Sequence, residues 1–255
     1  MFRSLPVLAL AGALFLAGCG TQSAGTAAAP PSASPSPTAD TRDAVTVVKE
    51  SFQRTFDTKT FTMTVHISAG TEQSADMSAN VDLAKDAVRM SMELPTGTTE
   101  VVKLADDMFI KAPGLGKKPY LRLDLDKLNP SSPLRESLNV ANQSGILDGV
   151  VTANKGAGDT YAGTADLKKA AEVSVATQKK SLEQMSRLAK NASAVPYTAK
   201  IDEQGRLTEL SYTVELSTGE MTTEILLTAL GEPVTVDRPA ADQVADATEE
   251  QYAFF

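Results

Sequence analysis

The sequence lacks tryptophan, and it contains one histidine and one cysteine. A single histidine excludes His-rich metal centres and two-histidine zinc motifs, and a single cysteine excludes an intramolecular disulfide. No glycine-rich phosphate loop, dinucleotide fingerprint or nucleophile motif occurs. We therefore expect no catalytic residue, no metal site and no cofactor.

Basic residues are also in short supply, with 24 Lys and Arg against 32 Asp and Glu, a formal charge of −8. Removal of residues 1–18 takes away Arg3 and no acidic residue, which brings the charge to −9. A net acidic surface argues against binding of nucleic acid and against electrostatic docking on anionic lipid. The roughly 200 residues after residue 40 suit one domain, which we expect to be monomeric.

The cysteine lies at the end of an N-terminal apolar run. Arg3 precedes the run Leu5–Leu16, and Leu16-Ala17-Gly18-Cys19 follows, an order typical of a secretory signal. The run is shorter than the roughly 20 residues that cross a bilayer. The four residues resemble a bacterial lipobox, which implies a signal peptide at residues 1–18, cleavage before Cys19 and a diacylglycerol on its sulfur. Two acyl chains anchor a protein stably, so we expect lipid anchoring at the extracytoplasmic face of the cell membrane.

We interpret residues 19–40 as the lipidated cysteine followed by a disordered linker. Ala, Ser, Thr, Pro and Gly dominate this segment, and such a composition forms no core. A flexible coil of this length reaches about 25 Å. We expect a folded domain at residues 41–240 and an acidic tail at residues 241–255.

The domain should begin with an amphipathic helix that ends near Phe56. Asp40 or Thr41 is expected to cap it, and Val45, Val48, Phe52 and Phe56 form one apolar stripe. Alternating apolar and polar residues then predict six short strands from Phe61 to Leu125, joined by tight turns. A meander of this kind has one apolar and one solvated face.

The second half repeats the pattern with more helix. We expect a helix at residues 133–142, a strand at 146–152, a short return strand at 160–164 and a helix at 166–191 that bends near 174–177. Three strands between residues 195 and 229 complete about eleven strands and three helical segments. Helices set between blocks of strands predict an α+β fold.

Three local stretches carry a resemblance to a known family. They are Asp107–Lys111 leading to Tyr120–Asp124, then Thr160–Leu167, and then Ile201–Leu207. With the lipobox and the initial helix and meander, they resemble the actinobacterial LppX/LprG-type lipoproteins, whose half-barrel is shared with the LolA/LolB carriers. The resemblance implies a curled antiparallel sheet with helices on its concave face and an apolar cavity between them that holds acyl chains.

The residues expected to face that cavity come from strand alternation. Methionine is frequent among them, and its flexible thioether adapts to varied apolar partners. The same alternation is typical of a packed core, and a one-residue register error would invert a strand. The candidate lining residues are Phe61, Met63, Val65, Met77, Val81, Met90, Met92, Met108, Tyr212, Val214, Met221 and Ile225.

These observations leave three functional hypotheses. The first is an anchored lipoprotein that binds or carries lipid or acylated molecules. The alternative is a non-catalytic module with a packed core that contacts other envelope proteins. A hydrolase is the weakest reading, because His66 alternates to the polar side of its strand and acidic pairs such as Asp106-Asp107 lie at turns, where solvated carboxylates are common.

Overall fold

A computed structural model describes residues 42–70, 73–94, 97–129, 132 and 145–252. They belong to one folded unit, Ala39–Phe255. The signal and linker predicted for residues 1–40, including Cys19, lie outside the described residues. The helix predicted at residues 133–142 does so as well.

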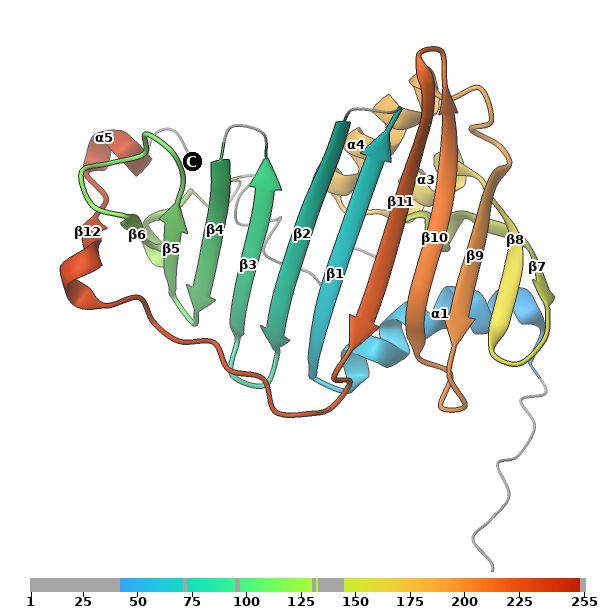
Figure 1. Cartoon of the computed structure of the whole chain (residues 1–255), viewed down its shortest axis with the longest axis horizontal. Coiled ribbons are helices and arrows are strands. Elements are labelled where there is room, and N and C mark those ends of the chain that lie inside the picture. Colours follow the sequence, from blue (N-terminus) through green and yellow to red (C-terminus); the bar gives the residue numbers. More distant parts are fainter. Residues whose placement is uncertain (1–41, 71–72, 95–96, 130–131, 133–144, 253–255) are drawn as a thin grey trace, which may run out of the picture. The chain divides into compact units, whose positions relative to one another are not determined.

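The unit is built on one curled, unclosed sheet of twelve strands (Figure 1), in the order β12-β6-β5-β4-β3-β2-β1-β11-β10-β9-β8-β7. The predicted α+β class is confirmed, with one strand more than expected. All pairs are antiparallel except β12 with β6. The strands are β1 (Thr60–Ala69), β2 (Gln73–Asp82), β3 (Ala87–Leu94), β4 (Gly97–Leu104), β5 (Asp107–Lys111), β6 (Tyr120–Asp124), β7 (Val150–Lys155), β8 (Thr160–Ala165), β9 (Val195–Ile201), β10 (Leu207–Leu216), β11 (Gly219–Thr228) and β12 (Val244–Asp246).

The first helix, α1 (Ala44–Asp57), packs its apolar stripe against β7, β9, β10 and β1. The predicted caps were wrong by a few residues: Asp43 is the N-cap, and its carboxylate accepts a hydrogen bond from the backbone N–H of Thr46 at 3.0 Å. Asp43 occupies extended backbone one residue before the helical turn, as a cap requires. At the other end, the rings of Phe52, Phe56 and Phe61 stack in series with centroids 4.6 and 4.9 Å apart.

The predicted strand at residues 146–152 was wrong in its first half. Residues Gly145–Gly149 form a 3-10 turn, η3, and β7 begins only at Val150. Gly145 adopts a φ of 63°, a left-handed conformation that suits glycine. A Cβ at Gly149 would lie 2.2 Å from the carbonyl oxygen of Asp166. The two glycines therefore let the chain turn closely beneath the start of the next helix.

The predicted bend in the long second helix is confirmed as a break. The chain forms α3 (Leu167–Val173) and α4 (Ala176–Leu188), with Ser174 and Val175 in extended conformation between them. Asp166 caps α3 through hydrogen bonds from the backbone N–H groups of Lys168 and Lys169. The side chains of Leu167, Ala170, Ala171 and Leu182 hold the pair against the core.

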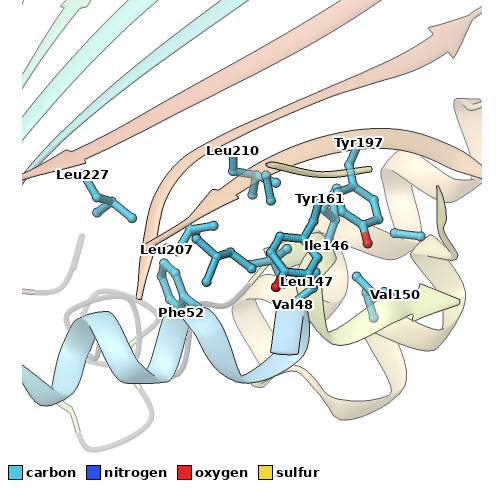
Figure 2. Packing of buried hydrophobic residues seen from close by; sticks show 14 of the residues in the cluster. Val48, Phe52, Ile146, Leu147, Val150, Tyr161, Tyr197, Leu207, Leu210 and Leu227 are labelled. Carbon is cyan, nitrogen blue, oxygen red and sulfur yellow. The ribbon is translucent and has the colours of Figure 1, made fainter. Parts of the chain in front are cut away.

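The main hydrophobic core lies between the helices and the β7–β11 half of the sheet. Figure 2 shows Val48 and Phe52 of α1 facing Leu207 and Leu210 of β10, with Ile146 and Leu147 of η3 filling the space beside them. Leu147 and Leu207 are fully buried. This half of the sheet is therefore covered by packed side chains.

The C-terminal strap, which we define as residues 232–252, runs along the β2–β6 half of the sheet (Figure 1). It contains a short 3-10 turn, η4 (Ala241–Gln243), the strand β12, and α5 (Glu249–Tyr252). Val236 and Val244 pack on a small cluster of Val102, Phe109 and Tyr120 on the face opposite the main core. The strap thus adds apolar contacts to the outer face through Val236 and Val244, and its end packs Ala247 and Tyr252 against a cluster on the inner side that includes Met108 and Leu123.

Candidate ligand-binding face

The pairing register places all twelve predicted lining residues on one face of the sheet. Met77 of β2 lies opposite Val65 and Met92, and Val65 lies opposite Ile225. Phe61 and Val81 pair with each other, as do Val214 and Met221. This is the inner face, because it also carries Leu210 and Leu227 of the main core.

The twelve residues differ in burial. Phe61, Val81 and Val214 belong to the main core, and Val65 is buried beside it. Met108 is fully buried in a different cluster, formed by the ends of β5 and β6 and the turn that follows (Ile110, Leu123, Leu125 and Leu128). The remaining seven are only partly buried: Met63, Met77, Met90, Met92, Tyr212, Met221 and Ile225.

Six of these partly buried side chains form what we call the inner strip: Met63, Met77, Met90, Met92, Met221 and Ile225. The strip crosses four adjacent strands, β3, β2, β1 and β11. With neighbouring strands about 4.8 Å apart, it is about 15 Å wide. Helix α1 contacts β1 at one end of this region and otherwise packs towards β7–β10. Met63, Met90, Met221 and Ile225 pack against the edge of the main core and stay partly exposed, and the strongest contacts of α1 lie elsewhere, on β7 and β10.

Small residues are interleaved with the strip. Ala79 lies between Met63 and Met90 across the strands, and Ala75 lies opposite Ile67, whose side chain is 36% exposed. Flexible thioethers beside alanines produce an apolar surface of adjustable shape. Such a surface suits ligands that lack fixed polar groups.

Polar groups on the inner face are few. Within the described residues of β1–β6, Lys103 is the one charged side chain at an inner position, between Val88 and Met108. It is 8% exposed, and its ammonium pairs with the carboxylate of Asp86 in the β2–β3 turn. On β10, burial raises the pKa of Tyr212. Burial also raises the pKa of Tyr197 to about 12, and its hydroxyl donates to the carbonyl of Thr152 at 3.0 Å. Both tyrosines are neutral at physiological pH.

The outer face carries a shallow hollow of about 410 Å³ that no sequence pattern indicated. His66 lies at its edge, with Nδ1 2.6 Å from Oδ1 of Asp76, and this hydrogen bond raises the pKa of the imidazole. Glu224 lies opposite His66 on β11. Polar residues from β1, β9, β10 and β11 line the hollow, among them Thr64, Thr198, Lys200, Glu209 and Ser211.

A second outer hollow, of about 450 Å³, lies where the C-terminal strap crosses the β2–β3 turn. Asp82, Lys85, Leu104 and Val236 are among its lining residues. Asp82 is 4% exposed and pairs with Lys85 at 2.8 Å, so its carboxylate is already neutralised.

Over the part of the chain that the structure describes, no three His, Cys, Asp or Glu side chains gather closely enough to hold a metal ion. Among the same residues, no helix has the length and apolar character needed to cross a membrane.

Comparisons with known proteins give weak matches. No family model matches the chain, and no curated protein matches it. Among solved structures, a LolA superfamily protein from Nitrosomonas europaea is 9% identical, with a TM-score of 0.30, over 75% of this chain and 94% of that one. The Pseudomonas aeruginosa MucA/MucB complex matches with 15% identity and a TM-score of 0.31, over 79% of this chain and 60% of that one. The chain thus spans less than two thirds of the length of the second.

Proposed function

We propose that the protein is a lipid-anchored extracytoplasmic lipoprotein whose inner strip binds the acyl chains of a lipid or acylated molecule. The observation that carries this proposal is the inner strip itself, which is a contiguous, partly exposed, methionine-rich surface across β3, β2, β1 and β11. A packed core would bury these side chains as fully as Leu207 or Val214.

The physical basis is the burial of apolar area. Each Å² removed from water contributes about 25 cal/mol before the cost of ordering the ligand. Methionine side chains repack around ligands of different shape at little cost. The strip therefore favours a class of ligands defined by hydrocarbon, and it sets few requirements on their polar ends.

The anchoring part of the proposal rests on the sequence. The lipobox-like Leu16–Cys19 and the low-complexity linker imply that the folded unit is tethered to a membrane surface. A tether of this reach, about 25 Å, keeps the inner strip close to a source of lipid. Metabolic labelling with a radioactive fatty acid should mark the wild type and leave a Cys19→Ala variant unlabelled.

Ligand binding is tested on the unit Ala39–Phe255, which contains all three hydrophobic clusters and so carries its own core. Palmitate is added, and thermal unfolding and native mass spectrometry are recorded. At a ligand concentration 100 times Kd the expected stabilisation is about 2.7 kcal/mol, which for a domain of this size raises Tm by about 5–10 °C. A mass unchanged after incubation with palmitate and with a diacyl phospholipid, together with an unchanged Tm, would sink the proposal.

Neighbouring residues on β2 supply a matched pair of variants. Met77 belongs to the inner strip, and Ser78 is exposed on the outer face. Met77→Glu should abolish binding because it places a charge among the acyl contacts, whereas Ser78→Glu should bind palmitate like the wild type. Equal binding by the two variants would place the ligand elsewhere.

The outer hollow beside His66 favours a second candidate function. Leu226 is 44% exposed at its edge, and polar residues surround it, as in the rim of a protein interface. A non-catalytic module that contacts another envelope protein there would show no response to lipid, and Leu226→Ser would weaken capture of its partner while palmitate binding stayed absent.

A further inference from the structure

The net acidic charge of the chain is distributed unevenly, and the helices α3 and α4 carry the opposite sign. Between Leu167 and Lys190, six basic residues face two acidic ones, Glu172 and Glu183, which gives this segment a charge of +4. The rest of the chain therefore carries −12. The six basic residues are Lys168, Lys169, Lys179, Lys180, Arg187 and Lys190.

These basic side chains are exposed, and none of the ion pairs found among the described residues involves them. All six are exposed to solvent. The ion pairs of the described chain join other residues instead, such as Lys103 with Asp86 and Lys200 with Glu209. Nine of the sixteen other described Lys and Arg residues form ion pairs, whereas none of these six does.

The same segment exposes the two least buried large apolar side chains of the described structure. Val173, the last residue of α3, is 69% exposed, and Leu188, the last residue of α4, is 57% exposed. The other 12 of the 13 residues of α4 lie between them. A helix of this length extends about 20 Å, and Lys179, Lys180 and Arg187 lie between Val173 and Leu188 in the sequence.

The two faces of α4 are distinct. Leu182 is buried and Met185 is packed against the main core. Lys180 and Arg187, seven residues apart, lie on the opposite side, and the exposed Leu188 lies at the border between the two sides. The outward side is thus free of any role in holding the helix to the sheet, because the inward side already does so.

We propose that the outward side of α3 and α4 docks on an anionic phospholipid bilayer. We name it the docking face and define it by Val173, Lys180, Arg187 and Leu188 with their neighbouring lysines. Basic side chains beside exposed aliphatic residues are the two elements that hold a peripheral helix at a charged membrane surface. Net charge does not oppose this contact, because at physiological salt charges beyond about 8 Å are screened.

This inference goes beyond acyl-chain binding and does not depend on it. The helices lie on the same side of the sheet as the inner strip, since Leu182 and Leu210 belong to one core. Docking through α3 and α4 therefore turns the inner side of the sheet towards the bilayer and the acidic outer face towards water. It also orients the folded unit, which a flexible tether alone does not.

The test is flotation of the unit Ala39–Phe255 with vesicles of phosphatidylcholine, with and without about one third phosphatidylglycerol. This unit lacks Cys19, so anchoring by acylation contributes nothing. We expect binding only to the anionic vesicles, with loss of binding as NaCl is raised from about 0.1 M to about 0.5 M. The double variant Lys180→Glu/Arg187→Glu should reduce the partition coefficient by about tenfold or more.

A charge-matched control uses Lys117→Glu/Lys127→Glu, two exposed residues on the loops that flank β6. It alters net charge equally and should change binding less than about threefold. Val173→Ser/Leu188→Ser should weaken binding without altering its salt dependence. Circular dichroism and Tm of each variant establish that it is folded.

Three outcomes would overturn the proposal. The first is equal binding to neutral and anionic vesicles, and the second is an equal loss in the charge-matched control. In the third, the unit does not bind vesicles but self-associates in analytical ultracentrifugation, and Leu188→Ser abolishes this self-association. The docking face would then be an interface between two copies. Palmitate binding by Lys180→Glu/Arg187→Glu is measured in parallel, so that failure of docking and failure of the inner strip are distinguished.

Discussion

Gly163 on β8 is the position where the smallest possible substitution should have a large effect. A Cβ added there would lie 1.9 Å from the carbonyl oxygen of Thr152 and 3.0 Å from the hydroxyl of Tyr197. The register of β7 with β8 shifts between Val150 and Thr152, which brings the Thr152 carbonyl towards β8. The hydroxyl of Tyr197 reaches across β8 to donate to this carbonyl, so glycine is required at the crossing point.

The magnitude follows from the displacement needed. The carbonyl must retreat from 1.9 Å to beyond 3.0 Å, and it is backbone rather than a flexible side chain. Overpacking of this kind costs about 1–3 kcal/mol, and the weakened β7–β8 and Tyr197 hydrogen bonds add about 1 kcal/mol. We therefore expect Gly163→Ala to lower the free energy of unfolding by about 3 kcal/mol and Tm by about 6–12 °C.

Urea unfolding of Gly163→Ala and of Gly116→Ala supplies the comparison. At Gly116 the nearest atom to a new Cβ is 3.9 Å away, so that variant should match the wild type within about 0.5 kcal/mol. Tyr197→Phe should cost about 1 kcal/mol and should not rescue Gly163→Ala, because the contact with Thr152 persists. A Gly163→Ala variant as stable as Gly116→Ala would refute the register assigned to β7 and β8.

Three further perturbations address other parts of the unit. Thr55→Val removes a buried hydroxyl that donates to the carbonyl of Leu207 at 2.9 Å, and urea unfolding should show a loss of about 1–2 kcal/mol. Asp76→Asn should lower the pKa of His66 as measured by NMR. Because the hydrogen bond to Asp76 raises that pKa in the folded state, its stabilisation of the wild type is complete below pH 6.5. The stabilisation disappears as pH rises through the folded pKa. For Asp107, burial raises the pKa, but hydrogen bonds from Arg238 and Arg122 outweigh burial and hold the pKa below 3.8. The wild type should therefore exceed Asp107→Asn in unfolding free energy by a constant amount above pH 3.8. Acid titration should show this difference disappear as pH falls through the folded pKa.

The face of each strand was predictable from sequence because side chains alternate with a period of two. The predicted alternation of Met63 with Thr64, and of Met77 with Ser78, assigned the same sides that the register shows. No single strand, however, reveals which helices cover it. The difference in burial between Val214 and Met77 depends on contacts between segments far apart in the chain, which alternation does not encode.

Two elements were not predicted from the sequence, each for its own reason. Ile146 and Leu147 read as strand residues because a short apolar run is compatible with strand or helix, and only the close packing at Gly149 favours the 3-10 turn. The strand β12 has three residues, Val244–Asp246, within an acidic segment. Its pairing with β6 is supported by one ion pair, from Arg122 to Asp246, and residues 124 positions apart in the sequence leave no periodic signal.

The docking face illustrates a different limit. The negative net charge of the whole chain predicted that its surface would not bind anionic lipid. Net charge is a sum over the whole chain, so it did not reveal the positively charged segment. The excess of lysine near Lys168 and Lys179 was visible in the sequence. The exposure of Val173 and Leu188 beside it was not, because Leu182 has the same apolar character and is buried.

The central pairing of β1 with β11 has a consequence for the order in which the chain can fold. The meander β1–β6 is complete by Asp124, yet one edge of β1 has no partner until Gly219–Thr228 has been synthesised. Such an edge, lined by Thr62, Thr64 and Val65, is a template for pairing with other chains. Closing it joins residues about 160 positions apart, which makes it a slow step. Any truncation before residue 219 therefore leaves a half-sheet in which one edge of β1 is open to pairing with other chains.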